Sequence, residues 1–174
     1  WLDASVPGEV HLDLMEAGLI NSPYIGINCL SARWVEESFW SYRKVFSVPK
    51  DALESDAWLY FEGLDYTAVI YLNGEEVGRH SNFFYPCRVN VTGKLREGDN
   101  TLVVQVESGM FAAAEKPIAG YPLTQDATNM LLRKRIWLRK PQCSFGWDWS
   151  PILLNVGIHK PVYLEWAKRV RVDE

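Results

Sequence analysis

The chain has 174 residues, a length that supports one well-buried domain and is short for two, so we expect a single domain over residues 1–174. Hydrophobic residues make up 48% and charged residues 23% of it, a composition that excludes disordered and fibrous proteins. The formal net charge of −4 argues against a partner that is nucleic acid or an anionic membrane, because binders of both need a basic surface.

The first element in the chain is a predicted short helix. After Pro7-Gly8, apolar residues recur at spacings of three and four as far as Ile20, and Gly18 marks the expected end of the helix. Residues 21–26 have the composition of a loop. From Phe39 onward the apolar period changes from that of a helix to two, which is typical of strands.

The period of two continues, with interruptions, to residue 166. The predicted strands cover residues 42–48, 57–61, 68–72, 75–79, 83–91, 102–106 and 161–166. Asn73-Gly74 predicts a tight hairpin between two of them, because this dipeptide readily adopts two positive φ angles. Strands about ten residues apart, without helical crossovers, predict an all-β antiparallel sandwich of jelly-roll type with a short N-terminal helix.

Residues 109–133 show no period, and a connection of this length inside a compact domain is typical of a functional or mobile segment. Just after it lies a basic cluster that could bind phosphate or carboxylate groups. Residues 136–138 interrupt the cluster like a buried segment, so we interpret it instead as a solvated strand or loop. The cluster comprises Arg133, Lys134, Arg135, Arg139 and Lys140.

Metal, cofactor and membrane signals are absent from the sequence. The cysteines are too few and too scattered for a disulfide framework or a zinc site, and the histidines lie far apart, so we expect no metal and no cofactor. No apolar run approaches the roughly 18 residues of a membrane span. The cysteines are Cys29, Cys87 and Cys143, which we interpret as buried or idle thiols. The histidines are His11, His80 and His159, which we interpret as structural or surface groups.

The chain begins at Trp1 without an initiator methionine, so we expect it to be a piece of a longer polypeptide. Without a visible leader sequence, the compartment stays open between cytoplasm, periplasm, lysosome and the cell exterior.

The most informative segment is residues 144–151, in which Asp148 stands between two tryptophans. A pyranose ring stacks its C–H face on an indole, and its hydroxyls need strong acceptors such as a carboxylate. One interpretation makes Asp148 the hydroxyl acceptor of a sugar site and a neighbouring indole its platform. The other makes Trp147 and Trp149 core residues and Asp148 a turn residue.

The order of the motifs along the chain resembles the N-terminal sugar-binding domain of glycoside hydrolase family 2, and within it most of all the β-mannosidases. The resemblance covers nearly the whole chain. The motifs are Val6-Pro7-Gly8-Glu9-Val10-His11, Trp40, Tyr42 to Phe46, Phe61-Glu62-Gly63-Leu64-Asp65, Leu72-Asn73-Gly74, Asn82-Phe83, Gly98-Asp99-Asn100 and Phe145-Gly146-Trp147-Asp148-Trp149.

The resemblance implies a galactose-binding-like jelly roll, followed in the parent enzyme by an immunoglobulin-like sandwich and a (β/α)₈ barrel. Such enzymes are retaining exo-glycosidases that remove terminal β-mannose, and their catalytic glutamates lie on the barrel, so this chain would hold no catalytic residue. By position, Asp148 would contact hydroxyls of the terminal sugar and Trp147 would form a pocket wall. Trp149 would belong to the core. The family usually has glycine at the position of Ser150. If the backbone there requires a positive φ, a serine would strain the turn.

The acidic pairs Glu36-Glu37 and Glu75-Glu76 could be considered as catalytic carboxylates. A retaining glycosidase needs two carboxyl groups about 5 to 5.5 Å apart, whereas adjacent residues of a strand point to opposite faces. We therefore expect both pairs to be solvated charges.

Two other functions remain open. The chain could be a free-standing carbohydrate-binding module on the same fold, or the accessory domain of a family 2 exo-β-glucosaminidase or β-galactosidase. A free-standing module needs a complete site of its own. This chain offers one constellation in one segment, which favours a pocket shared with another domain.

Overall fold

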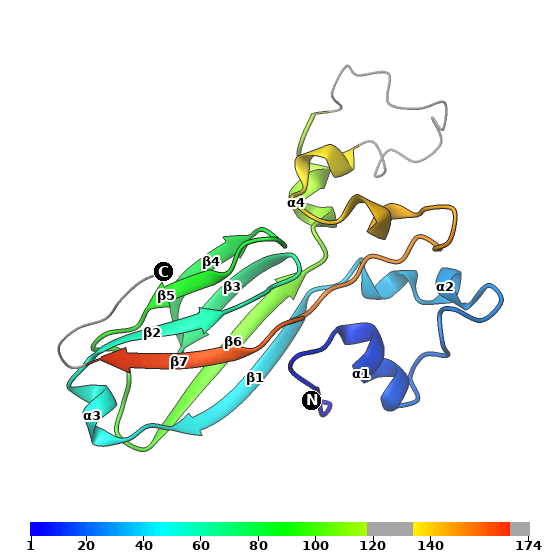
Figure 1. The fold of residues 1–174 in the computed structure, drawn as a ribbon. Coiled ribbons are helices and arrows are strands. Elements are labelled where there is room, and N and C mark those ends of the chain that lie inside the picture. The colour runs from blue at the N-terminus through cyan, green and yellow to red at the C-terminus, as the bar shows by residue number, and fades with distance from the viewer. Residues whose placement is uncertain (118–133, 168–174) are drawn as a thin grey trace.

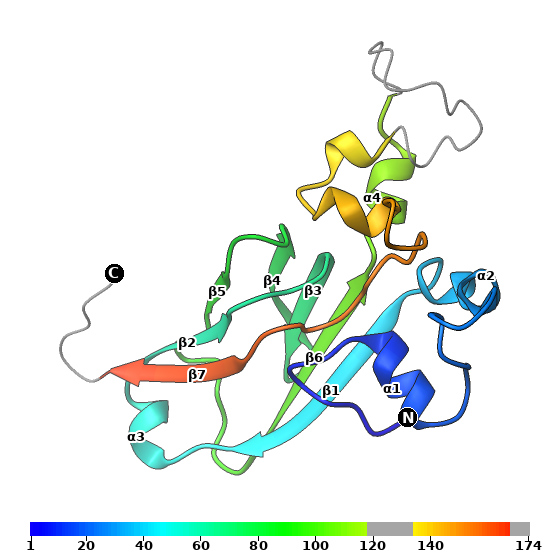
Figure 2. The ribbon, with the colours of Figure 1, turned by 45° about the vertical axis from the view of Figure 1, so that its right-hand side comes forward.

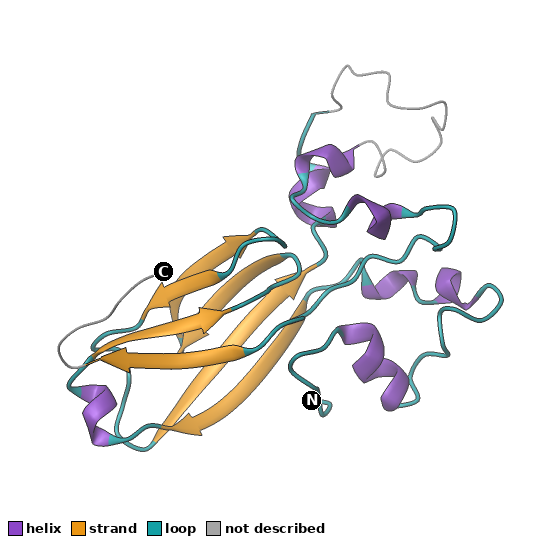
Figure 3. Ribbon diagram, viewed as in Figure 1, coloured by secondary structure: helices purple, strands orange, loops and turns teal. Residues whose placement is uncertain are grey.

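The computed structural model describes residues 1–117 and 134–167, and its strands form a two-layer sandwich (Figures 1 and 3). One sheet has the order β1-β6-β3-β4 and the other the order β5-β2-β7, with every neighbouring pair antiparallel. The predicted all-β sandwich is therefore confirmed. The strands are β1 Trp40–Ser47, β2 Asp56–Phe61, β3 Thr67–Leu72, β4 Glu75–Ser81, β5 Cys87–Asn90, β6 Asp99–Glu107 and β7 Val162–Ala167.

The core lies between the two sheets and follows directly from the period of two. Alternate side chains of a strand point to opposite faces, so one set of each strand faces the other sheet. On β2, β3 and β6 that set is apolar and almost fully buried. These residues are Ala57, Leu59, Phe61, Ala68, Ile70, Leu72, Leu102, Val104 and Val106.

The predicted hairpin joins β3 to β4. Asn73 has a φ of 55° and Gly74 a φ of 87°, the two positive angles that the dipeptide was expected to supply. The Asn73 side chain also binds its surroundings: its Nδ2 donates to the Lys94 carbonyl at 3.1 Å, and its Oδ1 accepts from the Thr101 backbone at 3.0 Å. The side chain of Asn73 therefore also fixes the turn to the segment that leads from Lys94 to Thr101.

The predicted N-terminal helix is α1, Val10–Glu16, and it ends just before Gly18, which has a φ of 70°. Within the described residues, six further helical turns were not predicted, because pieces of three to five residues are too short to show a helical period. They are α2 Asn28–Ser31, η1 Arg33–Val35, α3 Lys50–Leu53, α4 Met110–Ala114, η2 Arg135–Trp137 and η3 Gln142–Phe145.

The strand predicted over residues 83–91 is wrong in its first half, since β5 begins only at Cys87. The Asn82 side chain accepts from the Phe84 backbone at 2.9 Å, a local bond that competes with strand pairing. Pro86 then offers no backbone N–H to a ladder. Of the aperiodic segment 109–133, the first part contains α4, and residues 118–133 lie outside the described residues.

The helical turns other than α3 gather on one side of the sheets, together with the irregular segment that leads from η2 towards β7 (Figures 1 and 2). A second, smaller core holds this side together. Its buried members are Tyr66, Ala113, Leu138, Phe145 and Leu154. The candidate sugar-binding segment projects from this small core.

Candidate functional site

The Trp-Asp-Trp sequence forms a tight, exposed turn. The backbone N–H of Trp147 donates to the Ser150 carbonyl at 3.2 Å, and the N–H of Ser150 donates back to the Trp147 carbonyl at 3.1 Å. Asp148 and Trp149 therefore occupy the tip of the turn. Because backbone bonds close the turn, it does not depend on the carboxylate of Asp148 for its shape.

Both indoles of the turn are exposed to solvent. Trp147 is 53% and Trp149 76% exposed, and their ring centroids lie 5.6 Å apart with the planes tilted by 50°. The prediction that Trp149 belongs to the core is wrong, as is the alternative that both indoles are core residues. The physical reason is that Trp149 sits at the tip of a two-residue turn, where a side chain points away from the protein.

Asp148 is also exposed, and within the described part of the chain its carboxylate makes no hydrogen bond or ion pair. Its two oxygens offer about four lone-pair positions, all available to hydroxyl donors. The segment thus presents a carboxylate and two aromatic faces on one turn, which is the combination that a sugar ring requires.

Ser150 does not strain the turn. In residues 1–117 and 134–167 the only non-glycine residue with positive φ is Asn73, so the position of Ser150 has no need for glycine. The position that does need glycine is Gly146, with φ 101° and ψ 143°. A Cβ there would also come within 3.0 Å of the Ile152 side chain.

The turn is anchored on both sides by apolar packing. Phe145, directly before Gly146, is 2% exposed, and Leu154 on the far side is fully buried. Both pack into the small core, and Ile152 packs against the same cluster. The base of the segment is therefore fixed while its tip projects into solvent.

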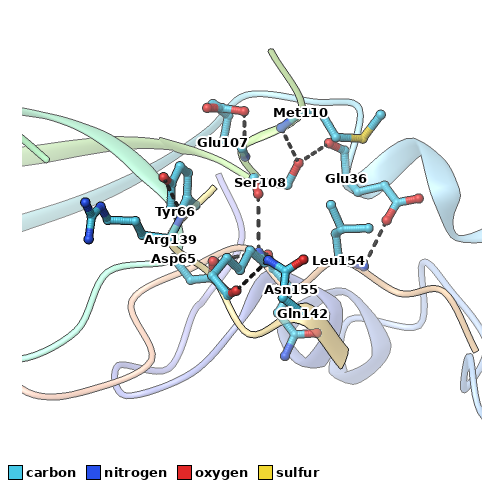
Figure 4. Close-up of polar contacts among 12 residues, drawn as sticks. Glu36, Asp65, Tyr66, Glu107, Ser108, Met110, Arg139, Gln142, Leu154 and Asn155 are labelled. Atoms are coloured by element: carbon cyan, nitrogen blue, oxygen red, sulfur yellow. Dashed lines mark hydrogen bonds and ion pairs between the residues drawn. The ribbon is translucent and has the colours of Figure 1, made fainter. Parts of the chain in front are cut away.

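Polar contacts anchor the same segment. Lys140 is completely buried, and its Nζ donates to Asp65 Oδ1 at 2.6 Å, to the Ser108 carbonyl at 3.3 Å and to the Asn155 carbonyl. Figure 4 shows the three acceptor residues converging on one place. All three ammonium protons are thereby used.

The solvated basic cluster that the sequence predicted is thus wrong for Lys140, although Arg139 is exposed as expected. Of the segment that interrupts the cluster, Ile136 and Trp137 belong to a 3₁₀ turn and are 41% and 44% exposed, whereas Leu138 is buried as expected. Lys140 can be buried because a carboxylate and two carbonyl groups replace the water around its ammonium group. These partners are distant in sequence, so no local pattern reveals them. Arg133 lies outside the described residues.

Glu36 is a second buried charge that the sequence analysis misplaced, since it is 1% exposed and not solvated. Its Oε2 accepts from the Leu154 backbone at 2.9 Å, and its other oxygen pairs with Arg33. Burial raises the pKa of the Glu36 carboxyl, and these contacts oppose the rise. Glu75 and Glu76 are solvent-exposed, as predicted.

Burial shifts the titration of three groups near the Lys140 contact. It raises the pKa of Asp65 to about 6 against the opposing charge of Lys140, and it raises the pKa of Glu9 to about 6 with a further contribution from Asp65. The pKa of His11 falls to about 4, first because of burial and second because of Lys140. Asp65 and His11 are buried, and Glu9 is partly buried.

The histidines have structural positions, as predicted. His11 is buried on α1, and His159 stacks on Phe83 with ring centroids 4.3 Å apart and planes 2° apart. His80 forms a bond of 2.6 Å with the Asn82 carbonyl. The described residues contain no group of three His, Cys, Asp or Glu side chains that could hold a metal ion.

A cavity of about 940 Å³ lies away from the turn, and strands β1 and β7 both contribute to its walls. Its walls combine core side chains such as Leu59 and Val104 with charged and aromatic side chains such as Asp13, Arg43 and Trp40. No residue of the Trp-Asp-Trp turn contributes to them. A smaller recess of about 280 Å³ lies beside the polar contacts at the base of the segment and includes Glu9, Asp65 and Asn155. Among the helices of the described ranges, none has the length and apolar character to cross a membrane.

Comparison with known proteins adds an independent finding. The model of the family described as the galactose-binding-like domain of glycosyl hydrolase 2 matches residues 1–160. Beta-mannosidase B of Emericella nidulans is 38% identical over 167 residues, which cover 95% of this chain and 20% of that protein. Beta-mannosidase B of Thermothelomyces thermophilus is 39% identical over 159 residues, which cover 91% of this chain and 18% of that protein.

A solved structure agrees with this. The crystal structure of a beta-D-mannosidase from Dictyoglomus thermophilum matches 95% of this chain with a TM-score of 0.84 and 43% sequence identity, and the match covers 20% of that chain. The chain therefore spans about a fifth of the length of these relatives.

Proposed function

Because the chain belongs to the galactose-binding-like domains of glycoside hydrolase family 2, we propose that it is the N-terminal substrate-pocket domain of a retaining exo-β-mannosidase. In this proposal residues 1–174 form one domain, and the catalytic glutamates lie on a barrel elsewhere in the parent chain. The substrate is an oligosaccharide with a terminal β-linked mannose. The mannoside specificity is supported by relatives that are named as β-mannosidases.

The observation that carries the proposal is the exposed turn of Trp147, Asp148 and Trp149. A carboxylate without a partner in the described chain is an acceptor ready for sugar hydroxyls, and the Trp147 indole offers an apolar wall. One turn cannot surround a pyranose. We therefore propose that Asp148 and Trp147 form one side of a pocket whose other side belongs to the barrel.

Exposed apolar side chains on the same side of the molecule support a covering domain. Exposed apolar side chains that gather in one region are typical of interaction sites. We propose that the immunoglobulin-like and barrel domains of the parent chain cover this side. The side chains, between 40% and 74% exposed, are Tyr24, Ile25, Ile27, Leu30, Trp34, Phe39, Phe111, Ile136 and Trp137.

The direct test is Asp148→Ala in the full-length enzyme, assayed with an aryl β-mannoside. Hydrogen bonds to a charged acceptor contribute about 1.5 to 3 kcal/mol, so kcat/KM should fall roughly ten- to a hundredfold, and further if the contacts tighten in the transition state. The thermal midpoint of the variant should stay close to that of the unmodified enzyme. The Asp148 carboxylate makes no hydrogen bond or ion pair with the described residues, so its removal takes no stabilising interaction from the fold.

The matched control is Asp56→Ala, which removes another exposed aspartate at the start of β2. It should leave kcat/KM unchanged. An Asp148→Ala enzyme with normal kcat/KM and a lowered thermal midpoint would show that Asp148 supports the turn and not the sugar.

Two alternatives give different results, one in the hydrolysis assay and one in a binding measurement on the isolated chain. If the parent is an exo-β-glucosaminidase or a β-galactosidase of the family, aryl glycosides of those sugars are cleaved faster than the mannoside. If the chain is a free-standing carbohydrate-binding module, it binds sugar tightly by itself and needs no barrel.

A further inference from the structure

The segment that carries the Trp-Asp-Trp turn leaves the body of the protein at Lys140 and returns at Asn155. The Lys140 ammonium donates to the Asn155 carbonyl, although the two residues are 15 apart in sequence. One side chain therefore closes the base of the whole excursion. The turn of residues 147–150 lies near its middle.

Asp65 holds both ends of this segment. Its side chain accepts from Lys140, and its backbone exchanges two hydrogen bonds with Gly157, with N···O distances of 2.9 and 2.7 Å. Ser108, the third acceptor of Lys140, directly follows β6, and its hydroxyl donates to the Glu36 carbonyl at 2.7 Å. The base of the excursion is thus fixed to the ends of the strands, as Figure 4 shows for Asp65, Ser108 and Asn155.

Folding stability alone does not require a lysine here. A buried ion pair loses so much hydration that apolar residues of similar volume often stabilise a protein equally well or better. An apolar side chain, however, has no protons to give, so it cannot join the Asn155 carbonyl to Asp65. What the ammonium adds is a defined geometry between the start and the end of the excursion.

We propose that Lys140 is a positioning residue for sugar binding: by joining Asn155 to Asp65 and Ser108, it fixes the direction in which the turn presents Asp148. This inference rests on the proposed function of Asp148. The Lys140 side chain is fully buried, so a sugar bound at the exposed turn would not reach it. Its effect on the reaction passes through Asp148.

The test is a double-mutant cycle in the full-length enzyme with Lys140→Met, Asp148→Ala and both changes together. For each protein, kcat and KM for an aryl β-mannoside are corrected for the folded fraction, measured by circular dichroism. A displacement of about 1 Å at a contact can cost up to a hundredfold, so we expect Lys140→Met to lower kcat/KM about tenfold. In the Asp148→Ala background the same change should cost less than about twofold, because the contact that Lys140 positions is already missing.

The matched control is Lys94→Met, which removes a lysine paired with Glu75 at the opposite end of the sandwich. It should leave both constants unchanged. If Lys140→Met alone lowers the folded fraction, the pair Asp65→Asn and Lys140→Met takes its place in the cycle, since it leaves no buried charge without its partner.

The possible failures are distinguishable. If Asp148→Ala leaves kcat/KM unchanged, the proposed function of Asp148 is wrong, and this inference fails with it. If Asp148→Ala lowers kcat/KM while Lys140→Met has no effect, or has the same effect in both backgrounds, only the positioning role is wrong.

Discussion

Charged side chains in this chain fall into two groups that their sequence neighbours do not distinguish. Lys140 follows Arg139 in a basic cluster and Glu36 precedes another glutamate, yet both are buried, whereas Asp148 stands between two tryptophans and is exposed. The difference lies in partners from distant segments. A charge enters the interior only where such partners replace its hydration.

His11 gives a prediction at this scale. Its pKa falls from an ordinary 6.5 to about 4, so between these pH values the unfolded chain binds a proton that the folded chain does not. Stability therefore falls as the pH is lowered through this window, by up to about 3 kcal/mol. The raised pKa values of Glu9 and Asp65 act in the opposite direction as the pH falls below about 6.

Comparison of the chain with its His11→Asn variant isolates the contribution of His11 to the pH dependence of stability, because Glu9 and Asp65 are present in both proteins. Denaturant unfolding at a series of pH values measures the two free energies. The free energy of the unmodified chain minus that of the variant should fall on going from pH 7 to pH 4. A difference that stays constant over this range would show that His11 is protonated inside the fold.

At the scale of elements, the Trp-Asp-Trp turn combines a rigid base with an exposed tip. Phe145 and Leu154 pack into the small core, and the backbone bonds between Trp147 and Ser150 close the turn. The entry into the turn depends on Gly146, whose φ and ψ are nearly inaccessible to residues with a Cβ.

We therefore expect Gly146→Ala to destabilise the domain by about 1 to 3 kcal/mol through backbone strain, with a further cost from the contact to Ile152. In the full-length enzyme it should also lower kcat/KM, because the turn shifts. Gly98→Ala is the matched control: Gly98 has a φ of 80° but open space around its Cβ position. Thermal unfolding and kinetics of both variants measure the two effects. If Gly146→Ala and Gly98→Ala changed kcat/KM equally, a local role of Gly146 would be contradicted.

At the scale of the whole molecule, one side of the sandwich carries the turn and a surface rich in exposed apolar side chains, including Tyr24, Ile27 and Trp137. An incomplete pocket gives little affinity, because one carboxylate and one indole leave most of a monosaccharide in water.

Binding of mannose to the isolated chain should accordingly be weaker than about 1 mM. Calorimetric titration measures it, with galactose as the comparison sugar. Micromolar affinity for either sugar would favour a free-standing binding module over a shared pocket.

The sequence by itself determined the elements whose cause is local. The period of two buries one face of a strand and predicted the sandwich, and Asn73-Gly74 predicted its hairpin because both residues tolerate positive φ. The single helical turns escaped prediction, since three to five residues show no period.

The sequence also singled out the Trp-Asp-Trp segment as a candidate sugar contact, because its side chains combine a carboxylate with indole rings. Its role in sugar binding stays a prediction. Only the tertiary structure decided that Trp149 is exposed and that Lys140 and Glu36 are buried. Their partners, Asp65, Asn155 and Leu154, are between 15 and 118 residues away in sequence. Glu36 also pairs with the nearby Arg33, but burial of these charges needs the distant contacts as well, and a local pattern contains no information about those.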